Sequence, residues 1–313
     1  MEFLDRETIE KAATFPEWVE AMEEALAAIV TGDFVLPKRM HLDRGNDTFL
    51  LMPCISDEYW TTKLVSFCPG NRESGKPSIY GTVILNDSKT GEPLAVMDGT
   101  KITAMRTAAV SAAGIKLLSP PGARRLGIIG TGVQGLYQVL FACAVRKINE
   151  VRAFDQVPGN LKLFTEGLHS RYPDIKIISC SNSSEVIRNS GVIITATNSR
   201  FPVFPNENDL FTGKTFVGIG SYKPDCREFP EQLFRQLDQL FVDTPDGKHE
   251  SGDLIDPVKN NWFDENSMHP IGDLISGKIV RSSNPTGLFK TVGSAIFDLF
   301  AAKLIYENSL KKL

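Results

Sequence analysis

The sequence predicts an α/β protein of two domains, one a doubly wound parallel sheet and the other a mixed α+β domain. From residue 125 onward, short apolar runs alternate with helical segments, which is typical of a parallel sheet with helical crossovers. Before it, apolar runs at 49–52, 61–67 and 80–85 are separated by turns rich in Pro, Gly and Asn, which indicates a mostly antiparallel sheet. The run Ser-Pro-Pro-Gly at 119–122 breaks the chain between the two patterns and is the best domain boundary.

In the first domain, a helix is expected to begin at Pro16 and to stop at Gly32. It has one apolar stripe, formed by Trp18, Val19, Met22, Ala25, Leu26 and Ile29. After the antiparallel sheet, a polar turn at 86–92 leads into a strand at 94–97. A helix at 100–118, dense in Ala, Ser and Gly, allows close packing of its neighbours.

The second domain is expected to hold six strands, at 125–129, 151–154, 175–178, 191–196, 215–220 and 239–243. A final helix at 291–306 has apolar residues at helical spacing and is expected to pack back on the first domain. We therefore expect residues 1–118 plus 291–313 to form the first domain and residues 119–290 the second, with the ligand site between them.

A glycine motif directly follows the first strand of the second domain. Gly130-Thr131-Gly132-Val133-Gln134-Gly135 has the spacing G-x-G-x-x-G and opens a helix at 136–145. Gly130 permits the tight turn, Gly132 lets backbone N–H groups approach a pyrophosphate, and Gly135 lets helix and strand pack closely. The motif predicts a Rossmann dinucleotide site that uses all six residues.

Asp155 follows the next strand and bears on the choice of dinucleotide. A carboxylate there accepts hydrogen bonds from a ribose 2′-hydroxyl and repels a 2′-phosphate, and no arginine follows directly. NAD is therefore favoured over NADP. The alternative is that Asp155 caps the helix opening at Pro158, and both roles can hold at once.

Composition narrows the class of protein. The 313 residues are 42% apolar, carry a net charge of −4 and show no basic cluster, which argues against a nucleic-acid or membrane partner and favours a small molecule. The chain has no signal-like N-terminus, no long apolar run, and five cysteines without C-x-x-C pairing, so we expect a soluble cytoplasmic protein. Four scattered histidines and the absence of G-x-S-x-G predict neither a metal site nor a serine hydrolase.

Three cations in the first domain stand among apolar or small residues. They are Arg39, Lys63 within a strand, and Arg106 within the Ala-rich helix. Each is costly to bury unpaired, and together they would suit a carboxylate, with arginine giving two-point contact and lysine a proton. The alternative is three ordinary salt-bridged or snorkelling side chains.

The sequence as a whole resembles the ornithine cyclodeaminase/mu-crystallin family. The resemblance runs in order through segments 61–65, 95–99, 102–112, 130–134, 250–254, 289–293 and 301–306. It implies a Rossmann domain bound to NAD, a substrate and dimerisation domain, and a homodimer formed through the latter. The family includes ornithine and lysine cyclodeaminases, amino-acid dehydrogenases, ketimine and imine reductases, and mu-crystallins that bind ligands, so membership leaves the substrate open.

The resemblance also assigns site residues. It implies that Arg39, Lys63 and Arg106 bind the substrate carboxylate, with Lys63 and Arg106 catalytic. Met52 is expected among the residues that shape the substrate pocket. Thr82 matches a position beside cofactor and substrate. Further positions assigned to the cofactor are Thr195, Ala196, Thr197, Ser221, Thr291, Val292 and Gly293.

Ser221 is the most informative departure from the family. Cyclodeaminases and some family dehydrogenases have an aspartate at this position, whereas ketimine reductases of the mu-crystallin type resemble this chain. A neutral hydroxyl cannot replace an acid that handles the amine proton. We therefore expect catalytic roles for Lys63, Arg106 and Ser221 in an NAD(H)-dependent imine or ketimine reductase, or an amino-acid dehydrogenase. The alternatives are ornithine cyclodeamination to proline and ammonia, and a mu-crystallin-like binding protein without turnover.

Overall fold

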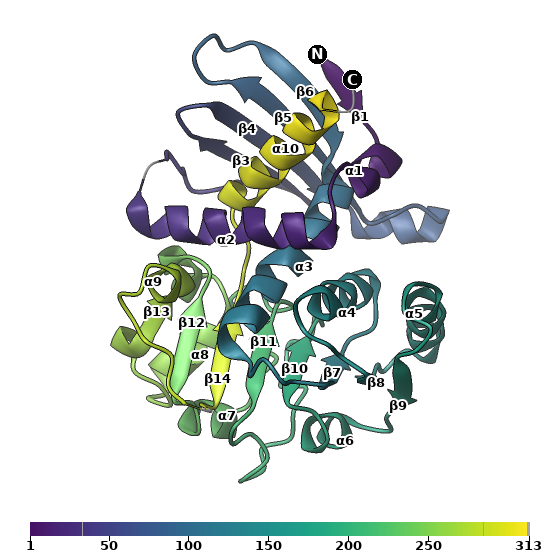
Figure 1. Ribbon diagram of the computed structural model, residues 1–313, viewed down its shortest axis with the longest axis vertical. Coiled ribbons are helices and arrows are strands. Elements are labelled where there is room, and N and C mark those ends of the chain that lie inside the picture. Colours follow the sequence, from purple (N-terminus) through teal and green to yellow (C-terminus); the bar gives the residue numbers. More distant parts are fainter. Residues whose placement is uncertain (33, 284, 312–313) are drawn as a thin grey trace. The chain divides into compact units, whose positions relative to one another are not determined.

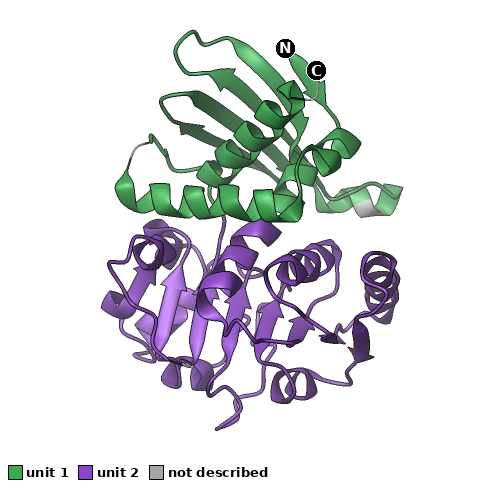
Figure 2. Ribbon diagram, in the orientation of Figure 1, with its two compact units in different colours: residues 1–106, 294–313 green, residues 107–293 purple. Residues whose placement is uncertain are grey.

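The computed structural model describes residues 1–32, 34–283 and 285–311. The chain forms two compact units, unit 1 from residues 1–106 with 294–313 and unit 2 from residues 107–293 (Figure 2). Unit 2 includes two segments that were expected in the first domain, residues 107–118 and 291–293. Close packing inside unit 2 accounts for the first of these segments, since a Cβ on Gly114 would lie 2.2 Å from the ring of Phe289.

Unit 1 is built on a six-stranded sheet with the order β1-β6-β5-β4-β3-β2, in which only the β1–β6 pair is parallel among the described strands. The strands are β1 (Glu2–Leu4), β2 (Met40–Arg44), β3 (Asp47–Ile55), β4 (Tyr59–Phe67), β5 (Ile79–Asp87) and β6 (Pro93–Asp98). The helices are α1 (Arg6–Ala12), α2 (Phe15–Thr31), the 3-10 helix at Pro69–Ser74, the start of α3 (Gly99–Leu118), and α10 (Ala295–Leu310).

The core of unit 1 lies between one face of this sheet and α10. Helix α10 crosses strands β3 to β5, and α2 packs beside α10 (Figure 1). Alternation along the strands places Met52, Lys63 and Val83 on this inner face, where all three are buried. The alternate residues form the outer face, where Phe3, Leu42, Phe49, Leu64 and Tyr80 are exposed.

Unit 2 is built on an eight-stranded parallel sheet with the order β13-β12-β14-β11-β10-β7-β8-β9. The strands are β7 (Arg125–Ile129), β8 (Glu150–Phe154), β9 (Lys176–Ser179), β10 (Val192–Thr195), β11 (Thr215–Gly218), β12 (Gln239–Val242), β13 (Met268–Pro270) and β14 (Gly287–Lys290). The helices are α4 (Val133–Val145), α5 (Pro158–Arg171), α6 (Ser183–Arg188), α7 (Glu231–Arg235), α8 (Gly252–Lys259) and α9 (Ile271–Ile275), with 3-10 helices at Pro245–His249 and Glu265–Ser267.

The strand order of unit 2 reverses between β7 and β10. Ligands of open parallel sheets bind outside the carboxyl ends of the strands at such a point, and the glycine motif directly follows β7. The predicted α/β class, with a doubly wound sheet and a mixed α+β part, is confirmed. None of the helices in the described residues is both long and apolar enough to span a membrane.

Several elements differ from the sequence-based expectation, which did not include β1, α1, β2 or β13. Strand β14 was not expected either, because its sequence Gly-Leu-Phe-Lys has only two apolar residues, directly after turn-forming residues. The final helix begins at Ala295 instead of 291, because Thr291, Val292 and Gly293 all donate hydrogen bonds to the Asp243 side chain.

Candidate functional site

The glycine loop of unit 2 has two crowded positions and one open position. Gly130 has φ of +91°, and a Cβ there would lie 2.5 Å from the Ala196 carbonyl oxygen. A Cβ on Gly135 would lie 2.1 Å from the Gly130 carbonyl oxygen. Around Gly132, by contrast, a Cβ would meet nothing within 4 Å. The first and third glycines are required by the fold itself, whereas the second borders open space.

The N-terminus of α4 presents its backbone donors beside that space. Gly132 is the N-cap residue and provides no side-chain hydrogen bond, so the first-turn N–H groups of Val133 and its neighbours have no side-chain cap. Val133 itself is 72% exposed. Open space at Gly132 together with an uncapped helix N-terminus fits the pyrophosphate of a dinucleotide.

Asp155 links the end of β8 to the glycine loop. Its Oδ2 accepts hydrogen bonds from the backbone N–H and the hydroxyl of Thr131, at 2.7 and 3.0 Å, and its Oδ1 accepts one from the Val157 N–H. The N-cap of α5 is Val157, which has no side-chain cap, so Asp155 stabilises the turn before the helix and not the N-cap position. The carboxylate is thus held beside Thr131 of the glycine loop.

The predicted positions 195–197 lie next to this loop. The Ala196 N–H donates to the carbonyl oxygen of Ile129, at the end of β7. Thr195 and Thr197 instead bind the carboxylate of the buried Glu228, through hydrogen bonds of 2.8 to 2.9 Å. Glu228 was missed by the sequence analysis, because Arg-Glu-Phe-Pro carries no motif that marks its acid as buried.

Ser221 is fully buried in unit 2. Its N–H donates to Glu228, its hydroxyl donates to the Cys226 carbonyl oxygen, and its Oγ lies 2.7 Å from Ser251 Oγ. The hydroxyl is therefore engaged by groups of its own unit.

The stretch 291–293 is held by a second missed acid. The Oδ2 of buried Asp243 accepts hydrogen bonds from the Thr291 hydroxyl and from the N–H groups of Val292 and Gly293, at 2.5, 3.0 and 2.8 Å. One carboxylate thus fixes all three predicted residues at the carboxyl end of β14. An acid directly after the apolar strand at 239–242 is the signal that could have revealed it.

In unit 1, Lys63 is a buried cation with a buried partner. Its side chain is 2% exposed, and its Nζ lies 2.7 Å from Oδ2 of Asp298 on α10. Arg106 Nε lies 3.3 Å from Oδ1 of the same carboxylate. Burial lowers the pKa of Lys63 to about 8; Asp298 opposes this shift, and the charges of Arg106 and Arg39 add to it.

The structure therefore brings together most of the residues predicted to bind substrate. Met52 is the cross-strand partner of Lys63. The charges of Arg106 and Arg39 both lower the pKa of Lys63. Asp298 was missed, although it is the one acid in the apolar run 295–302.

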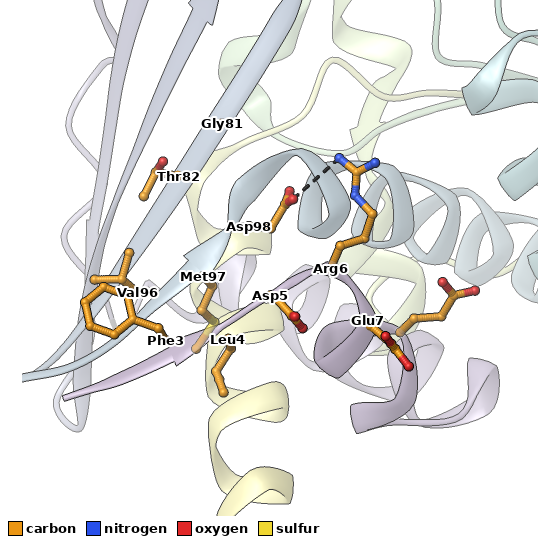
Figure 3. Close-up of a pocket in the computed structure, with 11 residues that line it drawn as sticks. Phe3, Leu4, Asp5, Arg6, Glu7, Gly81, Thr82, Val96, Met97 and Asp98 are labelled. Atoms are coloured by element: carbon orange, nitrogen blue, oxygen red, sulfur yellow. Dashed lines mark hydrogen bonds and ion pairs between the residues drawn. The ribbon is translucent and has the colours of Figure 1, made fainter. Parts of the chain in front are cut away.

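Thr82 does not share the face of Lys63. Lys63 pairs with Val83, so the adjacent Thr82 points to the other side of the sheet. There it lines a cavity of about 750 Å³ with Gly81, Val96 and Asp98, and Asp98 forms an ion pair with Arg6 (Figure 3). Among the described residues, no group of three or more His, Cys, Asp or Glu could hold a metal ion.

The fold and these sites define a class of protein, one with a Rossmann unit that fits a dinucleotide and a second unit whose buried cations suit a small carboxylate. The chain belongs to the ornithine cyclodeaminase/mu-crystallin family, whose model matches residues 1–312. The resemblance found in the sequence is therefore confirmed.

Relatives and solved structures cover nearly the whole chain. The chain is 31% identical over 303 residues to a Δ1-pyrroline-2-carboxylate reductase of Bacillus cereus, covering 92% of each. It is 35% identical over 261 residues to the ketimine reductase mu-crystallin of Mus musculus, covering 82% of this chain and 79% of the relative. The Thermococcus litoralis Δ1-pyrroline-2-carboxylate reductase, solved with NADH and L-proline, matches with a TM-score of 0.93 and 34% identity, covering 100% of this chain and 98% of the other. An archaeal alanine dehydrogenase dimer with bound NAD matches with a TM-score of 0.91 and 28% identity, covering 100% and 97%.

Proposed function

We propose that the protein reduces the C=N bond of a small cyclic α-imino acid with NADH, and that Δ1-pyrroline-2-carboxylate is the first substrate to test. The broader class is an NAD(H)-dependent oxidoreductase that acts on the C–N bond of a small imino or amino acid. The observation that carries the proposed chemistry is Lys63, a buried lysine that shares the carboxylate of Asp298 with Arg106 and whose pKa is lowered by burial to about 8. Such a group can both hold a carboxylate and release a proton near neutral pH.

The chain's own residues in unit 2 would hold the dinucleotide. The open position at Gly132 and the N–H groups at the start of α4 suit the pyrophosphate. Asp155 suits a ribose 2′-hydroxyl and disfavours a 2′-phosphate. We assign positions 195–197 and 291–293 to the same cofactor, each held by a buried carboxylate. When bound, NADH supplies the hydride for the imine carbon.

Lys63 would act as the general acid. Below pH 8 its ammonium form predominates, so it can donate a proton to the imine nitrogen as that nitrogen becomes an amine. Arg39 and Arg106 would bind the substrate carboxylate, and Met52, the neighbour of Lys63 across the strand pair, would contact the ring. The product would be the cyclic amino acid, proline in the case of Δ1-pyrroline-2-carboxylate.

Ser221 supports reduction over cyclodeamination. Its hydroxyl is engaged by Cys226 and Ser251, so the position offers no acid to handle an amine proton. We assign Ser221 the role of holding the loop after β11, and not that of proton transfer.

The test is NADH absorbance with the purified protein and a panel of imino acids. The panel contains Δ1-pyrroline-2-carboxylate, Δ1-piperideine-2-carboxylate, and pyruvate with ammonia or methylamine, each with NADH and with NADPH. Consumption of NADH with formation of proline from the pyrroline supports the proposal. Proline and ammonia from ornithine with catalytic NAD would establish a cyclodeaminase instead. Silence across the panel, with NADH still bound, would favour a ligand-binding protein.

We also propose a homodimer formed through the outer face of the unit 1 sheet. Phe3 and Leu64 on that face are 75% and 41% exposed, and the other exposed apolar residues named above lie on the same side. A second copy of the chain is the occupant we assign, supported by the structurally similar alanine dehydrogenase, which is a dimer. Five free thiols, at residues 54, 68, 143, 180 and 226, support a cytoplasmic location.

A further inference from the structure

Asp298 is a buried acid that faces two of the three cations proposed to bind substrate. It lies on α10 with no exposed side-chain surface, and its two oxygens form separate ion pairs with Lys63 of β4 and Arg106 of α3. Within the described residues, neither oxygen has a further hydrogen bond of good geometry. The two cations therefore provide the compensation that a buried carboxylate requires.

Arg106 approaches Asp298 with the Nε edge of its guanidinium. The shortest distance between the two side chains is 3.3 Å, from Nε to Oδ1, and this contact is an ion pair without hydrogen-bond geometry. The two terminal amino groups of a guanidinium form the planar fork that binds a carboxylate at two points. The charge of Asp298 beside Nε favours one direction of that fork.

Lys63 is surrounded by charges of both signs. Arg106 of α3 and Arg39, which precedes β2, oppose its ammonium form, and Asp298 of α10 favours it. Burial, together with the charge of Asp298, raises the pKa of the Cys54 thiol on β3 to about 12, so this thiol stays neutral. Asp298 is thus the one group named here that stabilises the charged form of Lys63 against burial and two like charges.

We propose that Asp298 is a positioning residue of the reaction, which keeps Lys63 protonated and directs Arg106 towards the substrate carboxylate without contacting the substrate itself. The identity of that substrate rests on the function proposed above. The role of Asp298 itself rests on the three-residue cluster.

The test is Asp298→Asn, with one readout that needs no turnover. The 13Cε resonance of Lys63, assigned by its loss in Lys63→Met, is titrated in the NAD-bound protein. Loss of an opposite charge at this distance is expected to lower the midpoint by about one to three pH units. The upper limit of the pH profile of kcat/KM should move down by the same amount, because only protonated Lys63 can donate. The Kd for NADH should stay the same.

Glu10→Gln is the matched control. It breaks the 2.6 Å ion pair of Glu10 with Lys101, another lysine of unit 1 whose side chain is nearly buried. This variant should leave both the Lys63 midpoint and the pH profile unchanged. In addition, Asp298→Glu should restore the midpoint towards the wild-type value, which a role in packing alone would not require.

Each outcome decides one of the two proposals. An unshifted Lys63 midpoint in folded Asp298→Asn overturns the role of Asp298. A wild-type protein that reduces no imino acid overturns the proposed function, while the titration still decides the role of Asp298. If Asp298→Asn does not fold, the smaller neutral variant Asp298→Ser replaces it. Failure of both to fold would show a purely structural role and overturn the proposal.

Discussion

Replacing Lys63 by methionine is the sharpest single test of the proposed chemistry. Burial lowers the pKa of Lys63 from 10.5 to about 8. That difference corresponds to roughly 3 kcal/mol against the charged form. Methionine has a similar length, and Arg106 remains in the variant as an ion-pair partner of Asp298. The variant loses the general acid, and kcat should fall by about 10²- to 10⁴-fold. NADH binding should not change, because the glycine loop belongs to unit 2.

The assay follows NADH absorbance with Δ1-pyrroline-2-carboxylate from about pH 6 to 10. In the wild-type protein, kcat/KM reports the free enzyme and should be level below the pKa of Lys63. It should decline as pH rises through about 8, because the ammonium form that donates the proton is lost. In Lys63→Met this decline should be absent, and NADH binding is measured separately by fluorescence.

Lys101→Met is the control for this variant. Lys101 is also nearly buried in unit 1 and pairs with Glu10, so its loss removes a comparable lysine away from the cluster. Its kcat and pH profile should match the wild type. Activity of Lys63→Met within about tenfold of wild type, or persistence of the decline near pH 8, would refute the role of Lys63 as general acid.

The remaining predictions concern the cofactor and the dimer. Gly132→Ala should leave Tm unchanged, because the added Cβ meets no atom, but it should raise the Kd for NADH tenfold or more. Gly135→Ala should instead lower the free energy of unfolding by about 1–3 kcal/mol, measured with denaturant, because its Cβ clashes with the Gly130 carbonyl oxygen. Equal effects of the two alanines on Tm would contradict this. Asp155→Asn should raise the ratio of kcat/KM for NADPH over NADH by about tenfold, and an unchanged ratio would remove Asp155 from cofactor choice. Leu64→Asp should give monomers by light scattering with an unchanged far-UV spectrum, and a persistent dimer would place the interface elsewhere.

Local sequence was sufficient for the glycine loop. The turn at Gly130 and the close contact between Gly130 and Gly135 arise within a few residues, so the glycine spacing between a predicted strand and a predicted helix identifies the loop. The close approach of Gly130 to Ala196 comes from a distant strand and could not be foreseen. The cations Lys63 and Arg106 could be recognised as unusual because each stands in an apolar or small-residue context.

The partners of these residues could not be found in that way. Asp298 reaches Lys63 and Arg106 only because α10 folds back on the sheet of unit 1, and sequence distance carries no information on that contact. Glu228 and Asp243 bind backbone N–H groups of loops that follow distant strands. Every residue except proline has a backbone N–H donor, so the sequence does not show which N–H group a given carboxylate will bind. Only the folded geometry determines that pairing.

Three buried acids, Glu228 and Asp243 of unit 2 and Asp298 of unit 1, differ in what they bind, and this difference predicts where pH acts. In unit 2, Glu228 and Asp243 accept hydrogen bonds from N–H and hydroxyl donors, so they fix the shape of the predicted cofactor loops. In unit 1, Asp298 faces two cations, so it also sets how readily Lys63 keeps its proton. Substitutions at Asp243 should therefore change NADH affinity at all pH values alike, whereas substitutions at Asp298 should move the pH profile itself.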